Sequence, residues 1–142
     1  MAGENRQERL QEIVGQLEYG RQQLEALNKQ IQMIDVTVMD LKSTMLAIEG
    51  ISQNKVGSEL IVPIGSGSYV KAKLADNQKI LVGVGGDISL EKSVSEAKEI
   101  LEGRVKSLTG SLEGLQKSAV ELSRRISGLN QEAETLMQGM RG

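Results

Sequence analysis

The chain has 142 residues, 39% of them hydrophobic and 25% charged, so its length and composition fit one ordinary globular domain. It has no Phe, no Trp and only two Tyr residues, so the large side chains that usually anchor a thick core are missing. The formal net charge is -2 with both signs interspersed, which argues against nucleic acid as a partner.

Cysteine and histidine are both absent, which excludes disulfides and thiolate chemistry and removes the usual ligands of zinc. The polar beginning, MAGENRQERLQEI, lacks the apolar centre of a signal peptide, and no run of about 18 apolar residues occurs. We therefore expect a soluble, cytoplasmic protein that has no disulfide and does not cross a membrane.

The first predicted element is a helix over residues 5–53, in which apolar residues recur at alternating steps of three and four. This spacing is the a/d heptad pattern of a coiled-coil seam, and only Gly20 among the seam positions is not apolar. An arm of about 45 residues is on the order of 70 Å long, too long for a compact domain of this mass. The seam consists of Leu10, Ile13, Leu17, Gly20, Leu24, Leu27, Ile31, Ile34, Val38, Leu41, Met45 and Ile48.

Two sets of apolar residues lie outside this seam pattern. Val14 and Met137 occupy e positions near the two termini, where they either close a helical hairpin or offer apolar surface to a client. Tyr19, Ala26 and Met33 are seven residues apart at outward c positions. This stripe is either scattered surface apolarity or a second contact for a client or a neighbouring arm.

Residues 57–91 are predicted to form two β-hairpins. The expected strands are Leu60–Ile64 and Tyr69–Leu74 around a Gly-Ser turn, then Lys79–Gly85 and Ile88–Glu91 around a Gly-Gly-Asp turn. Isolated hairpins are marginal in water and their unpaired edges attract other strands, so these are expected to complete a sheet or barrel with other subunits. Pro63 suits a strand edge or end in such an assembly.

The glycines of these turns do not form a phosphate-binding loop. Val70 and Ile88 stand where a dinucleotide fingerprint requires its third glycine, and no P-loop sequence is present. There is neither a calcium-loop pattern nor a nucleophile paired with a base. We expect no cofactor, no metal and no enzymatic activity.

The last predicted element is a second heptad helix over residues 93–140, which begins with a capping box formed by Ser93 and Glu96. Residues 94–101 are offset by four from the later seam, which predicts a stutter near Leu101–Val105. The two arms are expected to pair antiparallel, because a parallel pairing between chains would force the β segment into a bulge. The later seam consists of Val105, Leu108, Leu112, Leu115, Ala119, Leu122, Ile126, Leu129, Ala133, Leu136 and Met140.

The whole arrangement resembles the alpha-class subunit of prefoldin, of the archaeal type. The specific part runs from V-P-I-G-x-G-x-Y-V-x-A at Val62–Ala72 to I-L-V-G-V-G-G-D-I-S-L-E-K-S at Ile80–Ser93, whereas beta-class subunits have a single hairpin. One departure is Ser89, which replaces an aromatic residue of the family pattern. The resemblance implies a mainly α fold over residues 1–142: one long antiparallel two-helix coiled coil with two β-hairpins at its base.

The resemblance further implies an ATP-independent holdase subunit in a hexamer of two alpha and four beta subunits, which delivers unfolded polypeptides to a group II chaperonin. A coiled-coil scaffold or adaptor for one defined partner is the alternative, and an RNA-binding helical arm is disfavoured because no Lys/Arg stripe is present. The implied client contacts are Leu10, Ile13, Val14, Leu17, Leu129, Leu136, Met137 and Met140. The implied subunit contacts are Leu60, Ile61, Val62, Ile64, Tyr69, Val70, Ile80, Leu81, Val82, Val84, Ile88 and Leu90.

Overall fold

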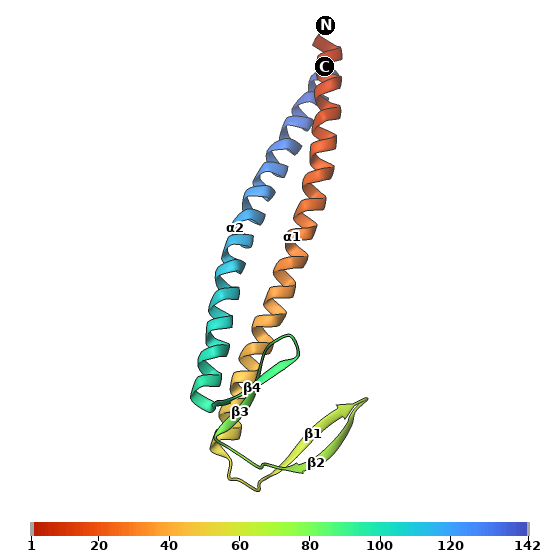
Figure 1. The fold of residues 1–142 in the computed structure, drawn as a ribbon. Coiled ribbons are helices and arrows are strands. Elements are labelled where there is room, and N and C mark those ends of the chain that lie inside the picture. Colours follow the sequence, from red (N-terminus) through yellow and green to blue (C-terminus); the bar gives the residue numbers. More distant parts are fainter. Residues whose placement is uncertain (1, 142) are drawn as a thin grey trace. The chain divides into compact units, whose positions relative to one another are not determined.

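The computed structural model describes residues 2–141, which form two long helices with two β-hairpins between them in the chain (Figure 1). The elements are α1 (Ala2–Gln53), β1 (Glu59–Gly65), β2 (Ser68–Lys73), β3 (Lys79–Gly85), β4 (Ile88–Ser93) and α2 (Val94–Arg141). The predicted mainly α fold with four short strands is confirmed. The chain divides into a helix-end unit, comprising the described residues up to Val36 and from Thr109 onward, and a hairpin unit, Thr37–Leu108.

In the helix-end unit the two helices run antiparallel. Arg6 contacts Gly139, Arg9 contacts Glu132, and Gly20 lies against Ile126, so the residue numbers fall on one helix as they rise on the other. Burial follows the heptad pattern, because within this unit only the seam positions and Arg9 are buried or half-buried among the described side chains. Met140 is the one predicted seam residue that is exposed.

Gly20 is the one seam position without an apolar side chain, and the packing of the helices explains why. A Cβ atom at this position would lie 3.2 Å from Cγ1 of Ile126, closer than ordinary van der Waals contact. Ile126 therefore occupies the space that a seam side chain would fill, and the absence of a side chain lets the two helices approach at this level. A glycine that the heptad pattern marks as a defect is thus part of the packing.

The hairpin unit has its own small core, in which β3 packs against both helices. Its buried members are Ile48 from α1, Val82 from β3, and Ala97 and Leu101 from α2. Burial on α2 at residues 97, 101 and 105 follows two successive steps of four, as expected for the predicted stutter.

Strand β4 leads directly into helix α2. The backbone N–H of Glu96 donates to Oγ of Ser93 at 3.1 Å, which confirms the serine half of the predicted cap. The backbone N–H of Val94 donates to the carbonyl of Gln78 at 3.0 Å, so the start of α2 is also tied to the residue before β3. These two bonds fix hairpin β3–β4 to the helix that comes after it.

The two hairpins have the same construction, repeated twenty residues later in the chain. Val62 pairs with Val70, and Val82 pairs with Leu90; each first strand carries a bulge, before Gly65 or before Gly85. The central turn residues, Ser66 and Gly67 in the first hairpin and Gly86 and Asp87 in the second, all have positive φ, as type I′ turns require. β1 pairs only with β2 and β3 only with β4 among the described residues, so they form two separate sheets.

The predicted strand ends differ slightly from those observed. β2 ends at Lys73 rather than Leu74, because Leu74 exchanges hydrogen bonds with the loop before β1. Its N–H donates to the carbonyl of Ser58 at 2.9 Å, and its carbonyl accepts from the N–H of Gly57 at 2.7 Å. The buried Leu74 side chain thereby closes the base of hairpin β1–β2.

Candidate functional site

The predicted client contacts all lie in the helix-end unit, on the two antiparallel helix ends. Val14, Met137 and Met140 are exposed, and Val14 has 54% of its residue surface accessible. Leu10, Leu129 and Leu136 are half-buried along the seam. Ile13 and Leu17 are buried between the helices.

These different degrees of burial divide the predicted client surface in two. An apolar client can contact Val14, Met137 and Met140 directly, and the flexible thioethers of the two methionines adapt to irregular partners. Ile13 and Leu17 become accessible only when the two helices separate. The closed helix ends therefore offer a narrow apolar strip, and opening them enlarges it.

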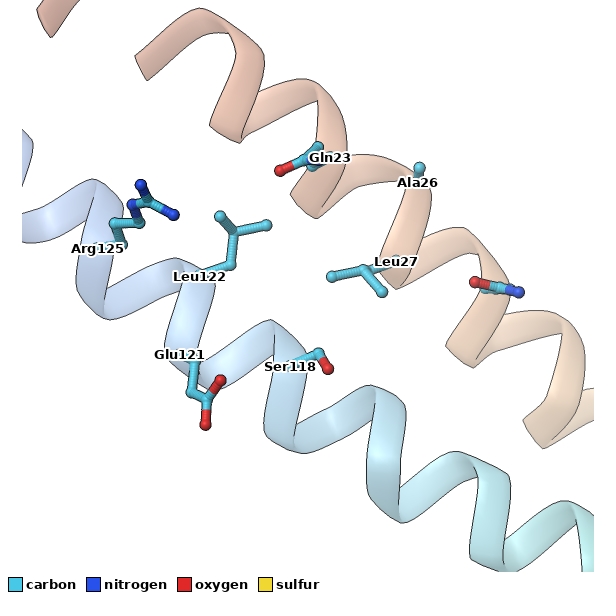
Figure 2. A pocket seen from close by; sticks show the side chains of 8 residues that line it. Gln23, Ala26, Leu27, Ser118, Glu121, Leu122 and Arg125 are labelled. Atoms are coloured by element: carbon cyan, nitrogen blue, oxygen red, sulfur yellow. The ribbon is translucent and has the colours of Figure 1, made fainter. Parts of the chain in front are cut away.

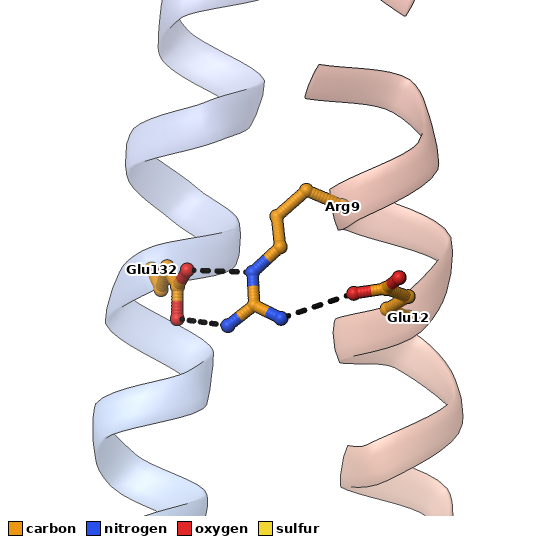
Figure 3. A network of polar contacts seen from close by, with 3 residues as sticks. All are labelled: Arg9, Glu12 and Glu132. Carbon is orange, nitrogen blue, oxygen red and sulfur yellow. Dashed lines mark hydrogen bonds and ion pairs between the residues drawn. The ribbon is translucent and has the colours of Figure 1, made fainter. Parts of the chain in front are cut away.

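An ion-pair cluster joins the two helices in the same unit (Figure 3). Arg9 Nε donates to Oε1 of Glu132 at 2.9 Å, and Nη2 donates to Oε2 of the same carboxylate at 3.2 Å. The remaining Nη1 donates to Oε2 of Glu12 at 3.2 Å. The hydrogen bonds to Glu132, and next the one to Glu12, raise the pKa of Arg9 above its ordinary value. Arg9 therefore stays cationic and contacts both helices across the seam.

This cluster is not among the residues predicted from the sequence, although the heptad pattern contains a signal for it. Arg9 and Glu132 each precede a seam residue and occupy g positions, which face each other in an antiparallel pair. Arg6 also crosses between the helices, since its Nη1 donates to the carbonyl of Gly139 at 2.9 Å. This second contact satisfies a carbonyl in the last turn of α2, and nothing in the heptad pattern points to it.

Hairpin β1–β2 carries half of the predicted subunit contacts, and both of its faces are accessible. Ile61, Ile64 and Tyr69 are strongly exposed. Val62 and Val70 are also exposed, and Leu60 is half-buried. Apolar side chains gathered on so short a hairpin are typical of a surface that another chain covers. The outer edges of both strands are free within the described residues, so they are available for pairing.

Hairpin β3–β4 carries the other half of the predicted subunit contacts, but one of its faces is covered by the chain's own helices. Val82 is buried in the intrachain core, and Ile80 is half-buried beside it. Arg104 of α2 supports this docking, because its Nη2 donates to the carbonyl of Gly83 at 2.6 Å. The remaining predicted contacts, Leu81, Val84, Ile88 and Leu90, are exposed.

Within residues 2–141 no group of three or more His, Cys, Asp or Glu side chains is placed to hold a metal ion. None of the helices in that range is long and apolar enough to span a lipid bilayer. The candidate sites are the apolar strip on the helix ends and the apolar surface on the hairpins.

Comparison with known proteins gives consistent matches. Residues 20–139 match the family described as "Prefoldin subunit". "Prefoldin subunit alpha" of Methanoculleus marisnigri is 33% identical, with 88% of this chain and 87% of the relative covered. "Prefoldin subunit alpha 1" of Methanocaldococcus jannaschii is 37% identical, with 81% and 83% covered.

Solved structures agree with these relatives in fold. A filamentous PFD from Methanocaldococcus jannaschii, determined by cryo-EM, aligns with a TM-score of 0.73 at 27% identity, covering 83% of this chain and 98% of that one. The prefoldin beta subunit from Thermococcus strain KS-1 aligns with a TM-score of 0.59 at 17% identity, covering 89% and 90%. The second likeness concerns the fold alone.

Proposed function

Because this chain belongs to the prefoldin family, as an alpha-class subunit of the archaeal type, we propose that it acts as an ATP-independent holdase. In this proposal the helix ends capture unfolded polypeptides, which are then delivered to a group II chaperonin. The supporting observation is the apolar strip of Val14, Met137 and Met140, exposed where the two antiparallel helix ends meet. Non-native proteins expose apolar segments, so this strip offers them complementary surface.

The assembly that we propose is a hexamer of two alpha and four beta subunits, in which each chain is a single prefoldin-like domain. The exposed apolar residues of both hairpins would contact neighbouring subunits, and the free strand edges would pair with theirs. Two alpha subunits would meet through these hairpins and each would recruit beta subunits. Val82 would contribute indirectly, by holding β3–β4 in place from the intrachain core.

We propose further that the protein is cytoplasmic and non-enzymatic and works without a cofactor. The absence of cysteine supports the cytoplasmic location, and the absence of both cysteine and histidine supports a protein without catalysis or a cofactor.

The holdase activity is tested by diluting a chemically denatured protein into buffer that contains the assembled complex and no ATP. Light scattering should fall when the complex is substoichiometric, and it should do so for several unrelated clients. If no client is protected, the chain is better explained as a scaffold or adaptor for one defined partner.

The position of the client site is tested by deleting residues 1–14 and 130–142 from the chain. The deletion removes Val14, Met137 and Met140 and leaves all four strands. Client capture should be lost while the complex keeps its mass. Loss of the complex would show that the assembly surface lies on the helix ends instead.

The assembly is tested by measuring the mass of the chain alone and after mixing it with a beta-class subunit. We expect one hexameric species in the mixture. The similar M. jannaschii structure is described as filamentous, so a mass distribution that grows with concentration is the specific alternative. That result would favour an open assembly of alpha-type chains over the closed hexamer.

A further inference from the structure

One flank of α1 carries no charge over residues 16–33, in the helix-end unit. Over residues 16–33 the c and g positions, which lie on one flank of the seam, hold Gln16, Tyr19, Gln23, Ala26, Gln30 and Met33. The b and e positions on the other flank of nearly the same stretch hold Glu18, Arg21, Glu25, Asn28, Gln32 and Asp35. Tyr19 is 63% exposed and Met33 is 71% exposed. Over this stretch α1 therefore presents charged side chains on one flank and only apolar or neutral side chains on the other.

A groove lies beside this uncharged stripe, between α1 and α2. Its main part has a volume of about 520 Å³ and is lined by Gln23, Ala26, Leu27, Gln30, Ser118, Glu121, Leu122 and Arg125. In Figure 2, Leu27 and Leu122 point toward each other between the helices and form an apolar floor. Ala26 and Ser118 are short, so the rim above this floor remains open.

The groove continues toward the helix ends. A smaller cavity of about 140 Å³ shares Gln23, Leu122 and Arg125 with it and extends to Gly20 and Leu129. Tyr19 also lines this smaller cavity. Leu129, a half-buried seam residue, is one of the proposed client contacts, so the groove reaches the proposed client site there. Val14 and Met137 lie at e positions, on the other flank of the seam.

We propose that this groove is a second client-binding surface, which holds an uncharged apolar segment of an unfolded polypeptide laid lengthwise along the arm. The proposal rests on the proposed holdase function and extends its site from the helix ends into the arm. The lining residues of α1 run from Gln16 to Gln30, about 21 Å at 1.5 Å per residue. An extended segment of about six residues has the same length.

The side chains of the groove suit an extended segment with no fixed sequence. Leu27 and Leu122 accept apolar side chains, while the amides of Gln23 and Gln30 can donate to and accept from any peptide backbone. Glu121 and Arg125 are the only charged residues of the lining, and both belong to α2. A charged client residue would lose water on entering and could pair only with one of these two residues, so segments with several charges are disfavoured.

The same residues are poorly suited to a permanent subunit contact. A stable protein interface buries about 800 Å² on each partner around a core of large apolar side chains. Tyr19 and Met33 are the only large exposed apolar residues of this stripe, and they are separated by about four turns of helix. The surface is therefore adapted to weak, reversible contact, which suits a transient client better than a second copy of the arm.

Site-specific photocrosslinking in the assembled complex tests the proposal. Benzoylphenylalanine replaces Tyr19 in the groove, Val14 on the helix ends, or Gln32 on the charged flank of the same helix. The probe client is α-lactalbumin that has been reduced and carbamidomethylated so that it stays unfolded. We expect crosslinks to this client from Tyr19 and Val14, each about tenfold above those from Gln32, because Tyr19 lines the groove and Val14 belongs to the exposed strip on the helix ends, whereas Gln32 belongs to neither.

The three positions separate the possible failures. Crosslinks from Val14 without crosslinks from Tyr19 would overturn the groove and leave the holdase function standing. Crosslinks from neither position would overturn both. Crosslinks from Tyr19 to another subunit in the absence of client would show that this face is an arm-to-arm contact, which also overturns the proposal.

A charge-matched pair of variants gives a second measurement. Gln23→Glu with Gln30→Glu adds two carboxylates to the groove, whereas Gln22→Glu with Gln32→Glu adds two to exposed positions away from it. The first pair should weaken binding of the unfolded α-lactalbumin about tenfold, because an apolar client segment laid in the groove would remove water from the added carboxylates. The second pair should leave binding unchanged. Equal effects of the two pairs would contradict the groove as a client site.

Discussion

Hairpins β1–β2 and β3–β4 share their register, bulge position and turn type, yet Val62 is 43% exposed and its counterpart Val82 only 5%. The difference arises from the segment that comes after each hairpin in the chain. β4 ends at the N-cap of α2, so the second hairpin folds against Ile48, Ala97 and Leu101. The first hairpin leads into a polar loop and stays uncovered. The same β unit therefore serves once as part of an intrachain core and once as an apolar surface for another chain.

The largest difference in unfolding free energy is expected between two variants that place an aspartate at the equivalent position of one hairpin or the other. Val82→Asp buries a carboxylate in the core and should reduce the free energy of unfolding of the isolated chain by about 3–5 kcal/mol. Val62→Asp should change it by less than about 1 kcal/mol, because its side chain remains in water. Urea unfolding followed by circular dichroism measures both values.

Assembly should be sensitive to the other substitution, Val62→Asp, which leaves the isolated chain stable. The folded Val62→Asp chain should no longer form the hexamer with beta-class subunits, because its carboxylate would be buried at the proposed contact. Equal loss of stability in the two variants would show that β1–β2 is also packed within its own chain.

A smaller effect is expected from Arg104→Ala, which removes the hydrogen bond from α2 to the carbonyl of Gly83. The unfolding free energy should fall by about 1.5 kcal/mol, since a charge-assisted bond is lost at the docked hairpin. Amide hydrogen exchange should accelerate in β3 and β4 and stay unchanged in β1 and β2. Faster exchange in all four strands would mean that the two hairpins are coupled.

One glycine in each turn can be replaced, with an expected loss of free energy about equal to or smaller than that of Arg104→Ala. Gly67→Ala and Gly86→Ala each place a side chain at positive φ, +73° and +57°, and each should cost its own hairpin about 1 kcal/mol. Only Gly86→Ala should lower the unfolding free energy of the whole chain, because only its hairpin is part of the core. Gly67→Ala should instead weaken binding to beta-class subunits, which a titration measures.

The smallest effect is expected from Glu49→Gln, which breaks the ion pair with Lys98 between the two helices, 3.2 Å long in the structure. Glu49 is more than half exposed, so the loss should be under about 0.5 kcal/mol and should vanish in about 1 M salt. A larger loss would mean that this pair, rather than the apolar core, holds the helices together beneath β3–β4.

Much of this fold could be predicted because it depends on local periodicity. The three-and-four spacing indicated the seam, and the Ser93 cap and the two glycine-containing turns indicated the element boundaries to within a few residues. Gly20 stood out as the exception to the spacing. The reason for a glycine there is its contact with Ile126, more than a hundred residues later in the chain. That contact is visible only when the two helices are paired.

Local periodicity cannot show which of two similar hairpins is covered. Val62 and Val82 occupy equivalent positions in similar strands, and the resemblance to prefoldin implies a subunit contact for both. The burial of Val82 depends on tertiary contacts with α1 and α2, and the bond from Arg104 has no local pattern. On the helix ends, Ile13 and Val14 were likewise predicted together, although one is buried and the other exposed.

The proposed assembly requires that other subunits cover the apolar surface of β1–β2. Amide hydrogen exchange, measured on the chain alone and in complex with beta-class subunits, tests this requirement directly. We expect β1 and β2 to exchange rapidly in the isolated chain and to become protected in the complex, while β3 stays protected in both states. Unchanged rapid exchange of β1 and β2 in a complex of confirmed mass would contradict the assignment of β1–β2 to the subunit interface.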